Sequence, residues 1–333
     1  QVLGEIAAGD ASEKNLGART AIHVMTGAPI PEGADAVVEQ ELTTIRNGTV
    51  LVPSALTAGR NIRRKGEDIR AGQIAVQKGR LLKAPEMGVL ASIGISSLEV
   101  FRKPTVAILT SGNELVAVDS KLEPGKIRNS NAYSLLGLVK QALCMPVDLG
   151  IVPDDEEILS RKIKEGLTHD ALITSGGVSV GKYDLMLKAL ENVGVVRKFW
   201  KVNIKPGGPF AFSVYIRKDQ KIPVFSLPGN PVSTVVTFLE LVLPGLMRLT
   251  GISSPSKRLQ LRARLDHDIR KNDKKRHFSR GILRNEGGEL FVKTTGPQSS
   301  GILTSMVLAN CLIVIPEDQQ DLKAGELVDV EIL

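Results

Sequence analysis

The stretch DALITSGGVSVGKYDLMLKAL, at positions 170–190, joins an apolar strand pattern to a helical pattern through a loop that contains three glycines. Its first part, DALITS, is apolar or small almost throughout, as is usual for a strand that is covered on both faces of its sheet. Its last part repeats apolar residues at the spacing of one helical face, which Val193 continues. The loop is therefore either a tight connection or a place where the backbone approaches a ligand closely.

The same alternation of apolar strands and amphipathic helices extends over about 105–250. Four segments predict buried strands: TVAILT, VDLGIV, DALITS and PVFSLPG. An amphipathic helical pattern follows each of them, which is typical of a mostly parallel sheet with helices on both faces. Ligands of such sheets lie beyond the carboxyl ends of the strands. We therefore expect one rim to carry the loops TSGNEL, VPDDEE, TSGGVSVGKYD and LPGNPVS.

The sequence on either side of this central region has a different pattern. Short apolar runs broken by Gly, Pro and Asn predict a β-rich module at each end of the chain. A connector with one helical pattern, APEMGVLASIGI, precedes the central region. We expect a multi-domain protein of the α/β plus β class, with four parts at 1–70, 71–103, 104–253 and 254–333.

Composition argues against several classes of function. The formal charge of +7 invites nucleic acid as a partner, but aromatic residues make up only 4% and are not interleaved with basic ones, so we expect no nucleic acid. No apolar run reaches the ~18 residues of a membrane span, and the first residues lack a signal-peptide pattern. The two cysteines, Cys144 and Cys311, predict buried reduced thiols. We therefore expect a cytoplasmic protein without membrane contact, whose positive excess suits a small anionic substrate.

The glycine-rich loop on the rim is a candidate phosphate site. Its backbone N–H groups could converge on one anion near a helix N-terminus. The loop matches neither the P-loop nor the dinucleotide-binding fingerprint, so a tight turn without a ligand stays an equal alternative. The residues concerned are Ser175, Gly176, Gly177 and Gly181.

Three acids fall on the same expected rim: Glu114, Asp154 and Asp184. Asp154 and Asp184 each precede a helical pattern and could be N-caps, whereas Glu114 has no such role. Alternatively, the three carboxylates hold a divalent cation that bridges to a substrate phosphate.

Two further segments offer positive charge. In SLPGNPVS, Asn230 predicts the N-cap and Pro231 the first residue of a helix, whose free N–H groups would point at the rim. Lys201 and Lys205 lie four residues apart, so on one strand they would share a face and could bind one anion. The other interpretation of the two lysines is a solvated strand edge.

Together, seven segments resemble the MoeA/gephyrin E-domain family of molybdopterin molybdenumtransferases: HVMTGAPIPEGADAVVEQE, NIRRKGEDI, ILTSGNEL, SGGVSVGKYD, WKVNIKPGGPFAF, SLPGNPVS and TTGPQSSGILTSM. The resemblance implies a linker domain (of which 71–103 is a remnant), a β-domain, a molybdopterin-binding α/β domain and a C-terminal β-barrel. It implies a homodimer and an enzyme that uses Mg²⁺, inserts molybdate into adenylylated molybdopterin and releases AMP. Other proteins of molybdenum-cofactor biosynthesis are possible partners.

The resemblance also assigns roles to single residues. Glu114, Asp154 and Asp184 would hold Mg²⁺ and assist cleavage of the adenylate. Lys201 and Lys205 would act beside them, while Thr26 and Asp68 would come from the partner subunit's β-domain. Arg280 and Ser300 would help form the oxyanion pocket. The remaining substrate-binding positions are Ser175, Gly176, Gly177, Gly181, Pro228, Gly229, Asn230 and Pro231.

The chain departs from the family pattern at three places. A segment with an M-D-G-Y-A-like motif is absent from this sequence, Asn113 stands where an acid is usual, and Gly208 stands where a basic residue is common. Two alternatives to the enzyme remain: a non-catalytic pterin-binding scaffold of the same fold, and a pterin- or nucleotide-binding domain of the competence/damage-inducible type. Molybdate and tungstate have the same charge and nearly the same size, so these residues favour neither.

Overall fold

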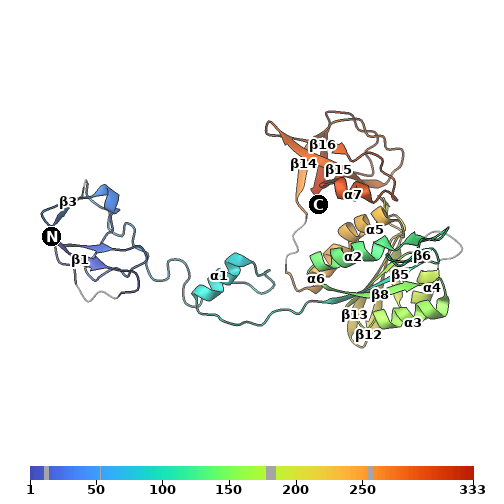
Figure 1. Ribbon diagram of the computed structural model, residues 1–333, viewed down its shortest axis with the longest axis horizontal. Helices are drawn as coiled ribbons and strands as arrows, with labels where there is room; N and C mark the ends of the chain where they lie inside the picture. The colour runs from blue at the N-terminus through green and yellow to red at the C-terminus, as the bar shows by residue number, and fades with distance from the viewer. Residues whose placement is uncertain (11–14, 53, 178–184, 254–257) are drawn as a thin grey trace. The chain divides into compact units, whose positions relative to one another are not determined.

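A computed structural model describes residues 1–333 except 11–14, 53, 178–184 and 254–257 (Figure 1). The chain divides into two compact units, Gln1–Gln77 and Lys78–Leu333, which are described separately. Two of the residues singled out above, Gly181 and Asp184, lie outside the described residues.

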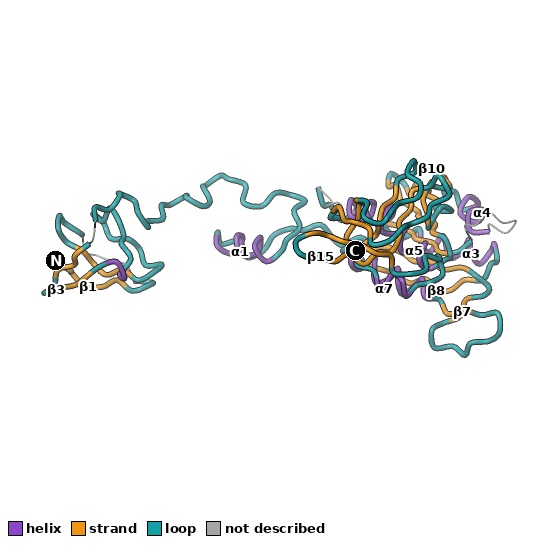
Figure 2. The backbone as a smooth tube through the Cα atoms, turned by 90° about the horizontal axis from the view of Figure 1, so that it is seen from above, coloured by secondary structure: helices purple, strands orange, loops and turns teal. Residues whose placement is uncertain are grey.

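The first unit is built from two small sheets. Strands β1 (Val2–Ile6) and β2 (Ala21–Val24) pair in parallel, and β3 (Thr44–Arg46) and β4 (Thr49–Leu51) form a hairpin after the short 3₁₀ helix η1 (Gln40–Leu42). Asn47 and Gly48, at the tip of the hairpin, both have positive φ, as an Asn-Gly hairpin turn requires. The β-rich character predicted for this region is confirmed. From 54 to 83 the chain forms neither helix nor strand (Figure 2).

The second unit contains the central sheet, with strand order β10-β12-β13-β9-β5-β8. The strands predicted as buried are present: β5 (Thr105–Ser111), β8 (Met145–Val152), β9 (Ala171–Ser175) and β13 (Gln220–Leu227). They pair in parallel, as expected. Two unpredicted strands, β10 (Val196–Trp200) and β12 (Ala211–Arg217), extend the sheet in antiparallel fashion.

Helices cover both faces of this sheet, which explains why its strands are apolar throughout. On β5, Ala107 and Leu109 pack in one core cluster with α3 (Glu156–Gly166) and α4 (Leu185–Asn192). The alternate residues Val106 and Ile108 pack in a second cluster on the other face. There the covering helices are α2 (Ser130–Gln141), α5 (Pro231–Thr237) and α6 (Leu243–Leu249), with the π-helical segment η2 (Phe238–Val242) joining the last two (Figure 1). The predicted helices are therefore confirmed, including the connector helix α1 (Ala84–Ser92).

Within the described residues, one helical stretch, Pro231–Leu249, is long and apolar enough to cross a membrane by length and composition alone. Core helices also pass this test. Val236, Phe238 and Val242 of this stretch have no exposed surface. Phe238 and Val242 pack against the central sheet, and Val236 packs with Phe278 and Leu312 of the barrel, so the stretch is a core helix here.

The C-terminal region is a closed β-barrel, as the family resemblance implied. Its strands are β14 (Gln260–Leu265), β15 (Arg276–Glu286), β16 (Glu289–Thr294), β17 (Cys311–Ile315) and β18 (Leu327–Ile332). The order β15-β16-β14-β18-β17 is closed because β17 also pairs with β15. The short helix α7 (Thr304–Leu308) precedes β17. A two-residue strand from the α/β region, β11 (Ile204–Lys205), pairs with the start of β15 and attaches the barrel to it.

Candidate functional site

The carboxyl ends of the four parallel strands meet at one edge of the sheet. Ser111 at the end of β5 is in register with Val152 of β8, and Ser175 of β9 is in register with both Thr110 and Leu227. The four loops that follow these strands therefore start side by side. The rim expected from the sequence is present.

Packing accounts for two glycines of the loop after β9. Gly176 and Gly177 have φ of +98° and +64°, which disfavours other residues. A Cβ at Gly176 would lie 2.3 Å from the carbonyl oxygen of Ser111, and one at Gly177 would lie 2.9 Å from Cβ of Met186. The loop thus presses against the end of β5, where the buried hydroxyl of Ser111 has no hydrogen-bond partner among the described residues. That hydroxyl is a free donor at the rim.

Asn131 connects two loops of the rim, and the sequence analysis did not identify it. Its side-chain amide donates to Oγ of Ser175 at 3.0 Å and to the carbonyl oxygen of Gly229 at 2.7 Å. Because one amide holds both loops, the glycine-rich loop and the PGNP segment keep a fixed spacing. The available signal was a polar residue in the first turn of a helix that begins at the rim.

The acids of the rim are placed differently from the expectation. The N-cap of α3 is Asp155, whose Oδ1 accepts from the backbone N–H of Glu157 and Ile158 at 3.0 and 2.9 Å. Asp154 is therefore not the cap, and the capping interpretation of this residue was wrong. Its exposed side chain is free of that role. Its backbone N–H donates to Oδ1 of Asn113 at 3.1 Å, which ties the loops after β5 and β8 together.

Glu114 lies on the neighbouring loop. Its carboxylate covers Gly112, since a Cβ at Gly112 would lie 2.6–2.7 Å from the two carboxylate oxygens. Glu114 and Asp154 are both exposed, and their loops leave paired strands. Carboxylate oxygens are the ligands that Mg²⁺ prefers, so the donor chemistry fits this ion. Among the described residues, however, no group of three acids, histidines or cysteines is close enough to hold a metal, and the third acid, Asp184, lies outside them.

Lys201 and Lys205 do not share one strand face, and that prediction was wrong. Strand β10 ends at Trp200, and Lys201 has φ of +67°, which breaks the two-residue alternation. The ammonium of Lys201 lies 4.4 Å from the ring centroid of Trp200, in a cation–π contact. Lys205 is in β11 and forms an ion pair with Asp273 at 3.0 Å. The two lysines are therefore held by different partners.

The PGNP segment starts α5 as the sequence predicted. Asn230 is the N-cap residue, without a side-chain capping bond, and Pro231 is in the first turn. The hydroxyl of Thr234 donates to the carbonyl oxygen of Pro228 at 2.7 Å and fixes the turn. One N–H group of the helix start is already occupied, because Val232 donates to the carbonyl oxygen of Ser300 at 3.0 Å. This bond attaches the barrel to the rim.

Arg280 of β15 is a buried cation, with only 1% of its surface exposed. Its Nε donates to Oγ of Ser305 at 3.0 Å, and Nη2 donates to the carbonyl oxygen of Ser299 at 3.2 Å. Among the described residues it forms no ion pair with a carboxylate. Burial lowers the pKa of Arg280 from its ordinary value. A buried guanidinium without a counterion is a strong candidate for binding an anion.

These contacts form a connected series. Asn131 links Ser175 to Gly229, the helix start beyond Gly229 links to Ser300, and the adjacent Ser299 links to Arg280. The series places the end of β9, a helix N-terminus and a buried guanidinium in one arrangement. Such a set favours an anionic ligand with several oxygen atoms.

Thr26 and Asp68 belong to the first unit and are described within it alone. Both are exposed turn residues. In the second unit the structure connects Ser175, Gly229, Ser300 and Arg280 through hydrogen bonds and places Glu114 and Asp154 on two neighbouring loops of the rim. Lys201 and Lys205 are held by other partners, and Thr26 and Asp68 belong to the first unit.

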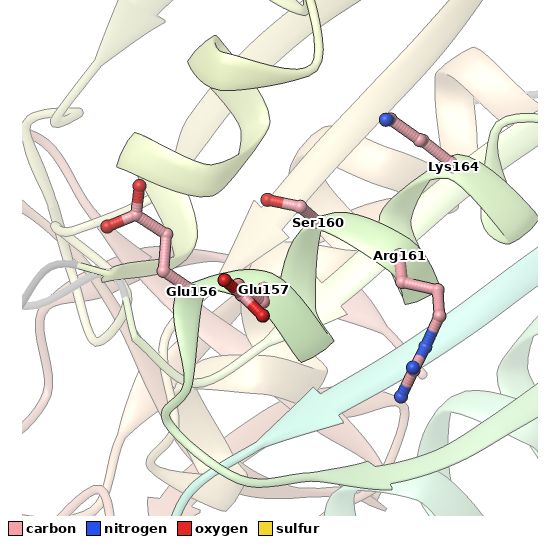
Figure 3. A pocket seen from close by; sticks show the side chains of 5 residues that line it. All are labelled: Glu156, Glu157, Ser160, Arg161 and Lys164. Atoms are coloured by element: carbon pink, nitrogen blue, oxygen red, sulfur yellow. The ribbon is translucent and has the colours of Figure 1, made fainter.

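A further cavity, of about 670 Å³, lies along α3 (Figure 3). A single helix lines it, through Glu156, Glu157, Ser160, Arg161 and Lys164. Glu156 is already paired with Lys188 of α4 at 2.7 Å, and the basic side chains of Arg161 and Lys164 point in different directions. The side chains that line this cavity do not converge on one ligand, so the rim remains the candidate site.

Comparison with protein families divides the chain into three matches. Residues 1–94 match the MoeA N-terminal region (domain I and II), 107–248 match a probable molybdopterin binding domain, and 262–333 match the MoeA C-terminal region (domain IV).

Similar proteins cover the whole chain. A molybdopterin molybdenumtransferase of Haemophilus influenzae is 37% identical over 99% of this chain and 81% of its own length. The protein of the same name from Bacillus subtilis is 34% identical over 99% of this chain and 77% of its own length. The crystal structure of a molybdopterin biosynthesis MoeA protein from Pyrococcus horikoshii covers all of this chain and 80% of its own, at 32% identity and a TM-score of 0.76.

Proposed function

This chain belongs to the MoeA family of molybdopterin molybdenumtransferases, and from this premise we propose that it inserts molybdate into adenylylated molybdopterin and releases AMP. It acts in molybdenum-cofactor biosynthesis as a transferase. The observation that carries the proposal is Arg280, a buried guanidinium without a carboxylate partner among the described residues, next to the start of α5.

Molybdate is a tetrahedral dianion and needs donors in fixed positions. The planar guanidinium of Arg280 is held by Ser305 and Ser299, so little side-chain freedom is lost when it binds an anion. Ser300 lies beside it, with its backbone fixed by Val232. We assign the oxyanion to this corner of the site, with Lys205 as a further cation.

The phosphate end of the adenylylated pterin suits the glycine-rich side of the rim. Gly176 and Gly229 bring backbone close together there, since a Cβ at Gly229 would lie 3.7 Å from Cα of Gly176. The hydroxyl of Ser111, which has no partner among the described residues, adds a donor. Pro228, Asn230 and Pro231 shape the adjoining helix start, and Asn131 sets the width between the two loops.

Glu114 and Asp154, with Asp184, are the residues that would hold Mg²⁺. When bound, the ion would neutralise charge that develops on the phosphates as the anhydride bond to AMP breaks. The carboxylates of Glu114 and Asp154 are exposed and form no ion pair within the part of the chain that the structure describes, which leaves them available for this role. Lys201, fixed over Trp200, supplies a cation near the end of β10.

We further propose a cytoplasmic homodimer in which Thr26 and Asp68 complete the site of the partner subunit. Support comes from their position in the first unit, which folds as a body separate from the rim. Thr26 and Asp68 are both exposed, as residues that contact a ligand on a partner would be.

The direct test is AMP release. Purified protein with adenylylated molybdopterin and Mg²⁺ should release AMP once molybdate is added, and the same sample without molybdate should release much less. Tight binding of the adenylate with no release under either condition would support the non-catalytic scaffold instead.

A further inference from the structure

The loop that contains Lys205 packs against the segment that precedes β15. Val202 donates to the carbonyl oxygen of Gly208 at 2.9 Å and closes the loop on itself. The side-chain amide of Asn203 donates to the carbonyl oxygen of Lys274 at 2.8 Å, and the backbone N–H of Arg276 donates to the carbonyl oxygen of Asn203 at 3.0 Å. The backbone on both sides of Lys275 is therefore fixed to this loop.

The charges of this contact do not balance. The carboxylate of Asp273 accepts from Lys205 through Oδ2 at 3.0 Å, and from His277 and the backbone N–H of Lys275 through Oδ1 at 2.7 and 3.1 Å. Burial lowers the pKa of His277 and so disfavours the charged form of its ring. Burial opposes ionisation of Asp273, but hydrogen bonds from Lys205 and His277 lower its pKa overall. The carboxylate of Asp273 thus pairs with the ammonium of Lys205 but meets Lys275 only through its backbone N–H, and the ammonium of Lys275 has no ion-pair partner among the described residues.

The surroundings of Gly208 show where the ammonium of Lys275 lies. Its backbone is not in the left-handed region, and a Cβ there would meet only ordinary contacts: the carbonyl oxygens of Ile204 and Val202 at 3.5 and 3.6 Å, and Nζ of Lys275 at 3.9 Å. A glycine is therefore not required by the backbone or by packing. The space that a longer side chain at 208 would enter already contains the ammonium of Lys275.

We propose that Lys275 is an anion-binding residue of the site, which supplies from the barrel the cation that position 208 lacks. Its ligand is a group with several anionic oxygens, either the oxyanion itself or a phosphate of the adenylylated pterin. Lys205 lies on the same loop as Gly208, and in this proposal it binds the same anionic group. The inference rests on the proposed function, because it takes the anion to be a substrate of that reaction.

The test compares Lys275→Ala with Lys274→Ala, which removes the same charge one residue earlier and leaves the backbone contact with Asn203 in place. Calorimetry measures the binding of molybdate alone and of AMP alone to each variant. A charge-assisted hydrogen bond is lost in Lys275→Ala, so we expect affinity for one of the two ligands to fall about tenfold, and less at high salt. The ligand that is affected identifies the source of the anion. Lys274→Ala should change neither.

The decisive variant is Gly208→Lys combined with Lys275→Ala, which returns an ammonium to the same space from the other loop. We expect it to restore most of the lost affinity, which a merely structural role of Lys275 would not allow. Equal affinities in Lys275→Ala and Lys274→Ala, or no recovery in the double variant, would overturn the inference. These titrations need no turnover, so a wild-type protein that binds molybdate without releasing AMP contradicts the proposed function only.

Discussion

Asp154 and Asp155 are neighbours, but only one of their carboxylates holds the helix. Asp155 accepts from two backbone N–H groups of α3, while the side chain of Asp154 is exposed at the rim. Asp155→Ala should lower the free energy of unfolding by about 1 kcal/mol and leave AMP release nearly unchanged. Asp154→Ala should leave stability within about 0.5 kcal/mol and slow AMP release at least tenfold. Urea denaturation and the release assay measure the two effects. If Asp154→Ala instead lowered the free energy of unfolding, Asp154 and not Asp155 would be the cap of α3, which would contradict the contacts described above.

The residue types at the site were visible in the sequence, but their contacts were not. The glycines, the rim acids and Arg280 stand in recognisable segments. Which of two adjacent aspartates caps a helix depends on where the helix begins, to within one residue. Asn131 was missed because its partners, Ser175 and Gly229, are 44 and 98 residues away in the chain.

Two glycines, one in the loop after β9 and one in α2, differ in whether the backbone and the packing require a glycine. Gly176, in the loop after β9, has positive φ and lies against the carbonyl of Ser111. Gly176→Ala should cost roughly 1–3 kcal/mol from backbone strain, with a further cost from the contact. Gly137, exposed within α2, has open space where a Cβ would be. Gly137→Ala should therefore raise the free energy of unfolding by about 0.5–1 kcal/mol. Thermal unfolding of the two variants checks the pair, and a harmless Gly176→Ala would mean that the loop is not pressed against β5 as described.

A buried charge cluster joins the π-helical segment η2 to the barrel. Arg258 contacts both Glu240 of η2 and Glu331 of β18, and both carboxyl groups are largely buried. Burial, opposed by Arg258, raises the pKa of Glu240 to about 7. A raised pKa means that the folded state binds the proton more tightly, so this group adds stability below its ordinary pKa that is lost as pH rises through about 7.

We therefore expect the contribution of Glu240 to the free energy of unfolding, about 3 kcal/mol, to be lost as pH rises from 4.5 to about 7. Urea midpoints over this range measure the loss. Glu240→Gln keeps the shape but cannot ionise, so the difference between the wild-type and variant midpoints should carry this dependence. Burial lowers the pKa of His277, which adds a dependence of the opposite sign that is the same in both proteins and cancels in the difference. Asp170, whose pKa Arg102 lowers to about 2, makes a contribution to stability that is lost only as pH falls below the ordinary value of 3.8, so it is constant over this window. A difference between the two midpoints that is constant from pH 4.5 to 7.5 would contradict the account of this cluster.

Among the elements, the four parallel strands were predictable because helices cover both of their faces, which makes them apolar throughout. The sequence of β10, VRKFW, has an exposed surface over most of its length and two basic residues, so it lacks that pattern. Because β10 was not predicted, Lys201 and Lys205 were wrongly placed on one strand. Their geometry depends on the end of β10 and on the pairing of β11 with a distant strand of the barrel.

At the scale of the whole molecule, the proposed homodimer predicts complementation between two inactive variants. Asp68→Ala removes a residue of the first unit, and Arg280→Ala removes one from the second. Each alone should release little AMP. In a random mixture, half of the dimers are mixed and one of their two sites is intact, so we expect about a quarter of wild-type activity. Activity that stays at the level of the separate variants after subunit exchange would contradict a site shared between subunits.

The central claim is that the corner around Arg280 receives the oxyanion and that its arrival leads to AMP release. The most direct measurement is the initial rate of AMP release from adenylylated molybdopterin as a function of molybdate concentration, for the wild type and for Arg280→Ala. We predict a saturable dependence in the wild type, and a dependence displaced to at least about tenfold higher molybdate in the variant, because a charge-assisted fork is lost. A wild-type rate that does not respond to molybdate, or identical curves for the two proteins, would contradict the account.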